Sequence, residues 1–109
     1  MADYVGDSFY LSKVATGVSQ DIIVFAGVEF MGESAKILNP GKRVLMPEPG
    51  ADCPMAHMAT KEEILKMREQ YDDLAVVCYI NSTAELKTYS DVCVTSSNAV
   101  KIVKNLPNK

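Results

Sequence analysis

Residues 75–80 read Ala75-Val76-Val77-Cys78-Tyr79-Ile80, an apolar run without polar alternation. A second run of this kind, Ile22-Ile23-Val24-Phe25-Ala26, lies earlier in the chain. Strands of a parallel sheet that is covered on both faces show this pattern, whereas half-exposed strands alternate apolar and polar residues. Both runs are therefore predicted to be buried parallel strands.

The rest of the chain extends this pattern into a regular alternation. Shorter apolar runs at 43–46 and 91–94 predict two more strands. Helical patterns lie at residues 7–18, 30–38, 83–88 and 98–106, and another begins at the capping box Thr60-Lys61-Glu62-Glu63. The order α-β-α-β-loop-α-β-α-β-α predicts an α/β fold, a three-layer αβα sandwich with a four-stranded parallel sheet. Its 109 residues suit one domain over 1–109.

Composition excludes several classes of protein. The net charge is −3 and no basic cluster exceeds Lys42-Arg43, so we expect no nucleic-acid partner. No apolar run approaches the roughly 20 residues that span a bilayer, and the N-terminus does not resemble a signal peptide. We therefore expect no membrane partner and a cytoplasmic location, where cysteines are reduced, metal-bound or buried rather than paired.

Open α/β sheets bind ligands beyond the carboxyl ends of their strands. In chain order, the residues expected at this edge are Gly27 and Glu29, then Cys53 and His57, then Asn81-Ser82-Thr83, and finally Thr95-Ser96-Ser97-Asn98. Cys53 and His57 lie in a loop, residues 47–59, that is rich in proline. Compact domains rarely carry a loop of this length without a function.

The stretch Thr95-Ser96-Ser97-Asn98 precedes the last predicted helix and allows two interpretations. Free N–H groups and hydroxyls at a helix start can bind a carboxylate or phosphate. Alternatively, Ser97 or Asn98 is simply the N-cap.

The three cysteines differ in their setting. Cys53 lies in a polar loop, where packing explains a cysteine poorly, so it is a metal ligand, a nucleophile or an accident. Cys78 and Cys93 lie within predicted strands and are expected to pack in the core. No Cys-x-x-Cys spacing is present, and Cys53 with His57 supplies only two ligands for a zinc ion. Glu29 and Glu33 are expected to be solvated carboxylates.

Several segments together resemble one enzyme family, the quinolinate synthases. In the family's order and spacing they are Ala2-Asp3-Tyr4-Val5-Gly6-Asp7-Ser8, Val24-Phe25-Ala26-Gly27-Val28, Phe30-Met31 with residues 33–40, Cys53-Pro54-Met55-Ala56, Tyr79-Ile80-Asn81 and Thr95-Ser96-Ser97-Asn98-Ala99-Val100-Lys101. The match extends over nearly all of the chain, which corresponds to roughly the first third of the family enzyme. Glu29 stands where several members have histidine, so the resemblance gives it no role.

The resemblance implies an enzyme of NAD biosynthesis with three similar αβα domains, of which this chain would be the first. It is a transferase that condenses iminoaspartate with dihydroxyacetone phosphate, with loss of water and phosphate, to form quinolinate. One cysteine from each domain holds a [4Fe–4S] cluster, and its free iron acts as a Lewis acid on a substrate oxygen. This chain would need the remaining two domains as partners, so we expect it to be inactive alone.

Roles transfer only to matching residues. The resemblance implies that Cys53 is a ligand of the [4Fe–4S] cluster and that Tyr79 and Asn81 are catalytic. It also implies that Ser8, Tyr79, Asn81 and Ser96 contact or position substrate, and Ser97 adjoins them.

Two other functions remain open from the residues alone. One is a small αβα module that binds an anion at the Ser96 helix start without catalysis. The other is a redox or zinc protein that uses Cys53 and His57.

Overall fold

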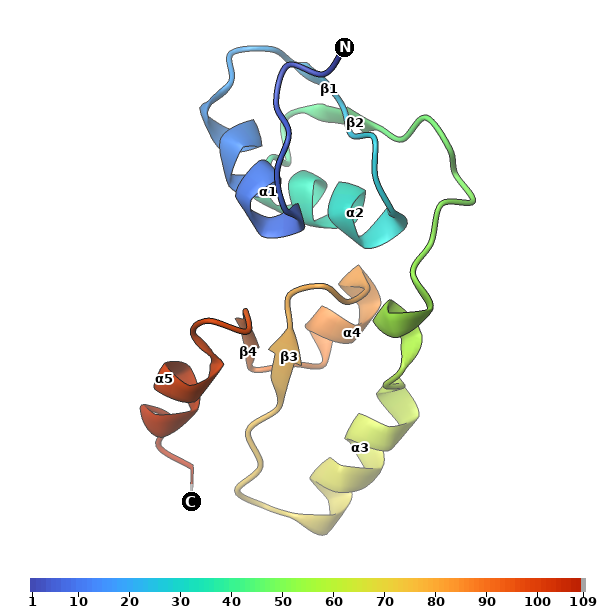
Figure 1. Cartoon of the computed structure of the whole chain (residues 1–109). Coiled ribbons are helices and arrows are strands. Elements are labelled where there is room, and N and C mark those ends of the chain that lie inside the picture. Colours follow the sequence, from blue (N-terminus) through green and yellow to red (C-terminus); the bar gives the residue numbers. More distant parts are fainter. Residues whose placement is uncertain (109) are drawn as a thin grey trace. The chain divides into compact units, whose positions relative to one another are not determined.

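The computed structural model describes residues 1–108, and its elements follow the predicted order (Figure 1). The contacts group the chain into two compact units, which divide between Cys53 and Pro54. The first unit contains α1 (Ser8–Gly17), β1 (Ile22–Val24), α2 (Glu29–Leu38) and β2 (Arg43–Leu45). The second contains the 3₁₀ turn η1 (Pro54–His57), α3 (Lys61–Gln70), β3 (Val77–Tyr79), α4 (Ala84–Thr88), β4 (Val92–Val94) and α5 (Ala99–Lys104). Assignment of residues 1–109 to one domain stays a prediction.

The α/β class and the parallel strand direction are confirmed, but the four-stranded sheet is not seen. Within residues 1–108, β1 pairs with β2 and β3 pairs with β4, which gives two separate parallel sheets. Each strand is three residues long, shorter than the apolar run that predicted it. The predicted burial of these strands is also only partly seen, because Ile22, Val24 and Tyr79 are exposed. The physical reason is that an apolar run indicates a strand suited to burial, but not which strands become its neighbours or what covers it.

In the first unit, α2 packs on β2 and α1 packs on α2. Phe25, Phe30, Ala15 and Ala35 form its buried apolar core. Because successive side chains of a strand point to opposite faces, Ile23 is half-buried while Ile22 and Val24 are exposed.

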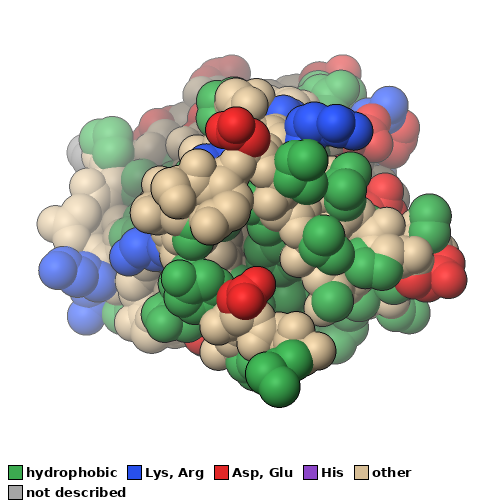
Figure 2. All heavy atoms as spheres, turned by 90° about the horizontal axis from the view of Figure 1, so that it is seen from above, with side chains coloured by type: hydrophobic (Ala, Val, Ile, Leu, Met, Phe, Trp, Pro, Cys, Tyr) green, Lys and Arg blue, Asp and Glu red, His purple; other side chains and the backbone are tan. Residues whose placement is uncertain are grey.

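The outer face of this first sheet is therefore apolar and uncovered. Ile22 is 50% exposed, Val24 64% and Leu45 43%. Figure 2 looks onto the side on which β1 and β2 lie, and hydrophobic side chains gather there among scattered charges. Parallel sheets are normally covered on both faces. This face is consequently suited to burial against further protein.

The predicted caps of α1 and α3 are confirmed. The Asp7 carboxylate accepts a hydrogen bond from the Tyr10 N–H at 2.8 Å and caps α1. Thr60 and Glu63 form the capping box of α3, and Thr83 caps α4. Part of the predicted loop at 47–59 forms the 3₁₀ turn η1, although its proline content had predicted no regular structure there.

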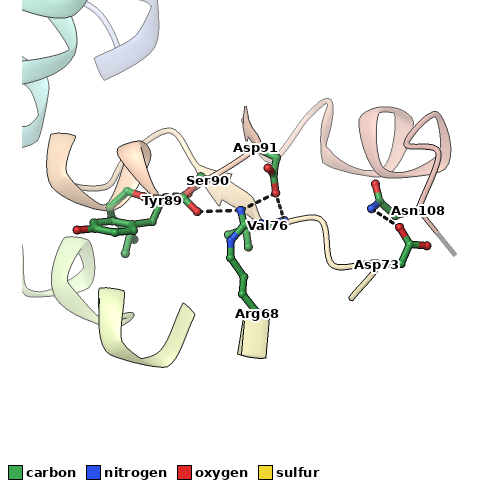
Figure 3. A network of polar contacts seen from close by, with 8 residues as sticks. Arg68, Asp73, Val76, Tyr89, Ser90, Asp91 and Asn108 are labelled. Carbon is green, nitrogen blue, oxygen red and sulfur yellow. Dashed lines mark hydrogen bonds and ion pairs between the residues drawn. The ribbon is translucent and has the colours of Figure 1, made fainter. Parts of the chain in front are cut away.

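In the second unit, one polar network holds α3 to the starts of β3 and β4 (Figure 3). Arg68 Nη2 donates to Asp91 Oδ2 at 2.8 Å and to the Tyr89 carbonyl at 3.1 Å. The same Asp91 oxygen accepts from the Val76 N–H at 2.7 Å. This acceptance lowers the pKa of Asp91, and Arg68 lowers it further. This network therefore joins α3 to the amino ends of the two strands whose register is Val77 with Val92.

Candidate functional site

The carboxyl ends of β3 and β4 bring three predicted site residues together. Tyr79 is the last residue of β3, and Asn81 follows it by two positions. Ser96 follows the end of β4 at Val94 by two positions. The strands are parallel and Tyr79 is in register with Val94, so these residues share one edge of the sheet. The structure thus agrees with the predicted edge for Asn81 and Ser96, and it adds Tyr79, which the resemblance alone had pointed to.

Their side chains converge on one hydroxyl group. The Tyr79 hydroxyl accepts a hydrogen bond from Asn81 Nδ2 at 3.5 Å and from Ser96 Oγ at 3.4 Å. Both distances are long for such contacts. Tyr79 is 48% exposed and Ser96 is exposed, so the cluster is open to a ligand. With two donors directed at its oxygen, the Tyr79 hydroxyl keeps its own hydrogen to donate.

The turn before α5 uses its polar groups internally. Asn98 is the residue at the N-cap position but makes no side-chain cap. Instead, its Oδ1 accepts from the Thr95 N–H at 2.7 Å. The N–H groups of Asn98 and Ala99 both donate to the Thr95 carbonyl, at 3.2 and 3.0 Å. The N–H groups of Asn98 and Ala99 are therefore already hydrogen-bonded within the turn and are not free for a ligand. Ser97 is exposed, and its Oγ lies 2.9 Å from Thr95 Oγ1.

Ser8 and Cys53 belong to the first unit. Ser8 opens α1 and is half-buried, and its carbonyl accepts from Ser12 Oγ at 2.9 Å. Cys53 lies beyond the carboxyl end of β2 and is half-buried, and its N–H donates to Asp52 Oδ1 at 2.7 Å. The neighbouring Ala51 carbonyl accepts from the Glu29 N–H at 2.8 Å, which ties the loop to α2.

Cys78 and Cys93 have the packing roles that the sequence predicted. Cys78 is buried, and its Sγ lies 3.0 Å from Ser82 Oγ. Cys93 is half-buried, and its pKa is raised by burial and by Cys78, against a smaller lowering by Lys87. A raised pKa disfavours the thiolate that ligates a metal.

Within residues 1–108, no group of three or more His, Cys, Asp or Glu side chains could hold a metal ion. His57 ends η1 and is exposed. None of the helices formed by these residues has the length and apolar character needed to cross a membrane.

Two open grooves were not anticipated from the sequence. One, of about 500 Å³, lies in the first unit between α2 and β2 and is lined by Glu29, Glu33, Lys36 and Arg43 with apolar neighbours. The other, of about 330 Å³, lies in the second unit beside η1 and the starts of α3 and α4. Glu29, Glu33 and Lys36 are spaced by four and three residues, which places their side chains on one face of α2. This spacing is the sequence feature from which the first groove could have been inferred.

Comparison with known proteins gives one consistent result. A family model described as "Quinolinate synthetase A protein" matches residues 1–109. A quinolinate synthase of Fusobacterium nucleatum is 68% identical over 109 residues, which are all of this chain and 37% of that protein. Those of Caldicellulosiruptor saccharolyticus and Clostridioides difficile are 60% and 55% identical over 108 and 109 residues, each match spanning 36% of the relative. The chain thus spans a little over a third of the length of these curated relatives.

Proposed function

The chain belongs to the quinolinate synthetase A protein family, and from that membership we propose that it is the N-terminal portion of a quinolinate synthase. The complete enzyme would act in NAD biosynthesis and condense iminoaspartate with dihydroxyacetone phosphate. The convergence of Tyr79, Asn81 and Ser96 at one sheet edge is the observation that carries this proposal to named residues.

The chemistry of these side chains suits oxygen-rich substrates. Hydroxyl and carboxamide groups donate to carboxylate, phosphate and carbonyl oxygens. Tyr79 and Asn81 would act at the reacting atoms, since the Tyr79 hydroxyl retains a hydrogen for donation and the Asn81 carboxamide lies beside it. Ser8, Ser96 and Ser97 would bind substrate.

Cys53 would be this chain's ligand to a [4Fe–4S] cluster. It is the cysteine of this chain that lies on a loop rather than in a strand, where its thiolate could extend toward a metal shared with other domains. When bound, the cluster supplies an iron that acts as a Lewis acid on a substrate oxygen. The other two cysteine ligands would come from the remaining two domains of the enzyme, which we propose as obligatory partners.

The finer fold is part of the same proposal. We infer that the complete enzyme has the three-layer αβα sandwich with four-stranded parallel sheets. A sheet of two parallel strands has two unpaired outer edges, and the exposed Ile22 and Val24 leave one face of the first sheet uncovered. Both features are consistent with further strands and helices. We also propose a cytoplasmic location.

The small anion-binding module is not favoured. The family model and the curated relatives that match all or nearly all of the chain are those of an enzyme rather than of a binding module. A zinc or redox role for Cys53 and His57 finds no supporting ligand cluster among residues 1–108.

The test is quinolinate formation by the full-length enzyme that contains this sequence. After anaerobic loading with iron and sulfide, the enzyme should form quinolinate from iminoaspartate and dihydroxyacetone phosphate, while residues 1–109 alone should form none. An iron-loaded full-length enzyme that makes no quinolinate would overturn the proposal.

A further inference from the structure

Asn81 lies in the short turn between β3 and α4, and the residues on both sides of it are anchored. Before it, the Ile80 N–H donates to the Val94 carbonyl at 2.8 Å, which extends the pairing of β3 with β4. After it, Ser82 is only 5% exposed, and its Oγ lies 3.0 Å from Cys78 Sγ. The backbone that carries Asn81 is therefore held against the sheet by its two neighbours.

Lys87, in α4, supplies a further anchor for the same turn. Its Nζ donates to the Ser82 carbonyl at 2.9 Å. A hydrogen bond from an ammonium group is stronger than one between neutral groups. Lys87 is half-buried, and while burial raises the pKa of Cys93, the Lys87 charge opposes that rise. The ammonium group thus lies near β4 as well as at the turn that follows β3.

We propose that Lys87 is a positioning residue of the substrate site, which acts through Asn81 by holding the Ser82 carbonyl. The anchored turn directs Asn81 Nδ2 toward the Tyr79 hydroxyl, 3.5 Å away. This inference rests on the proposed function, since it assumes that Asn81 contacts the substrate. Without the Lys87 bond, a ligand would have to order the turn as it binds, and that ordering weakens affinity.

Three variants of Lys87 separate its hydrogen bond from the rest of the side chain. Lys87→Met keeps most of the apolar stem but removes the donor and the charge. Lys87→Arg keeps both and is the rescue variant. Lys87→Gln replaces the methionine variant if that fails to fold, because its amide nitrogen lies one bond nearer the backbone and falls short of the carbonyl.

Lys42→Met is the matched control. Lys42 is also half-buried, and its Nζ donates to the Ala15 carbonyl at 3.0 Å and to the Val18 carbonyl. These bonds lie in the first unit, at the end of α1. The control therefore loses the same kind of lysine-to-carbonyl bond without touching the turn of Asn81.

The experiment measures the quinolinate dissociation constant of the reconstituted full-length enzyme containing this sequence. Thermal midpoint and ligand-free amide hydrogen exchange at residues 80–84 are recorded for each variant. We expect Lys87→Met to weaken binding about five- to tenfold, the cost of ordering one residue on binding, and to speed exchange at 80–84. Lys87→Arg should restore affinity to within about twofold. Lys42→Met should bind as the wild type does, even where its thermal midpoint falls.

A double-mutant cycle tests whether Lys87 acts through Asn81. If it does, adding Lys87→Met to Asn81→Ala should weaken quinolinate binding by less than about twofold more. The inference is overturned, and the function left intact, by additive losses, by an equal loss in Lys42→Met, by no recovery in Lys87→Arg, or by wild-type affinity in the folded methionine or glutamine variant. A wild-type enzyme that forms no quinolinate would instead overturn the function and this inference with it.

Discussion

Cys78 lies opposite Cys93 in register across the parallel strands β3 and β4. Both therefore sit one residue before the carboxyl ends of their strands, which are Tyr79 and Val94. Burial and the neighbouring thiol raise the pKa of Cys93. The pair contributes packing, and its thiols should be chemically quiet at neutral pH.

Cysteine alkylation should reveal this difference. In the metal-free chain at pH 8, we expect iodoacetamide to modify Cys53 first, because Cys78 is buried and the pKa of the half-buried Cys93 is raised. Cys93 should react more slowly and should speed up as the pH rises through its elevated pKa. Peptide mass spectrometry over time gives the three rates. Modification of Cys78 or Cys93 as fast as Cys53 in folded protein would refute this order.

Asp91 should make the stability of the second unit depend on pH. Its pKa in the folded state lies below the ordinary value of 3.8, chiefly because it accepts from the Val76 N–H. A group with a depressed folded pKa contributes stability above its unfolded pKa and loses it as the pH falls through the folded pKa. Asp91→Ala should therefore lower the thermal midpoint at pH 7 and lessen the further loss below about pH 4.

Asp72→Ala is the control for the Asp91 variant, since it removes the same charge from an exposed position in the same unit. Its thermal midpoint should follow the wild type across the pH range. An Asp91 variant that matches the wild type at pH 7 would show that the network in Figure 3 does not stabilise the chain.

Local features of the fold were predictable because they depend on neighbouring residues. The Thr60 capping box and the Asp7 cap were read from residues three apart. Strand pairing was not predictable in the same way. Val24 in β1 and Val77 in β3 look alike in the sequence, and nothing in the two residues indicates that their strands belong to different sheets.

The candidate site, like the fold, was predictable in part. The position of Asn81 and Ser96 after parallel strands was enough to place them at one edge. The bond from Thr95 to Asn98 was missed because an asparagine at a helix start is normally read as a cap. Thr95 and Asn98 have the spacing of a capping box, but that rule names Glu or Gln at the second position, so Asn98 was not read as the acceptor.

The uncovered apolar face of the first sheet should make the isolated chain prone to self-association. Ile22, Val24 and Leu45 are each more than 40% exposed there. We expect residues 1–109 to bind a hydrophobic dye and to self-associate as their concentration rises. Val24→Thr with Leu45→Gln should reduce both effects, whereas Val100→Thr, at an exposed position of α5, should reduce them less. Sedimentation that shows a monomer at high concentration, without dye binding, would contradict this expectation.

Cys53 should be the cysteine of this chain whose loss abolishes function in the full-length enzyme. Its loop position allows a thiolate to reach a shared cluster, whereas Cys78 is buried against Ser82 and the raised pKa of Cys93 disfavours its thiolate. Cys53→Ser should leave the fold intact but remove the cluster and quinolinate formation. Cys78→Ala or Cys93→Ala should cost about 1 kcal/mol of stability or somewhat more and retain both. Iron content, visible absorbance and quinolinate yield after anaerobic reconstitution are the measurements. Full iron loading in the Cys53 variant, or cluster loss in a folded Cys78 or Cys93 variant, would mean that the ligand has been assigned to the wrong residue.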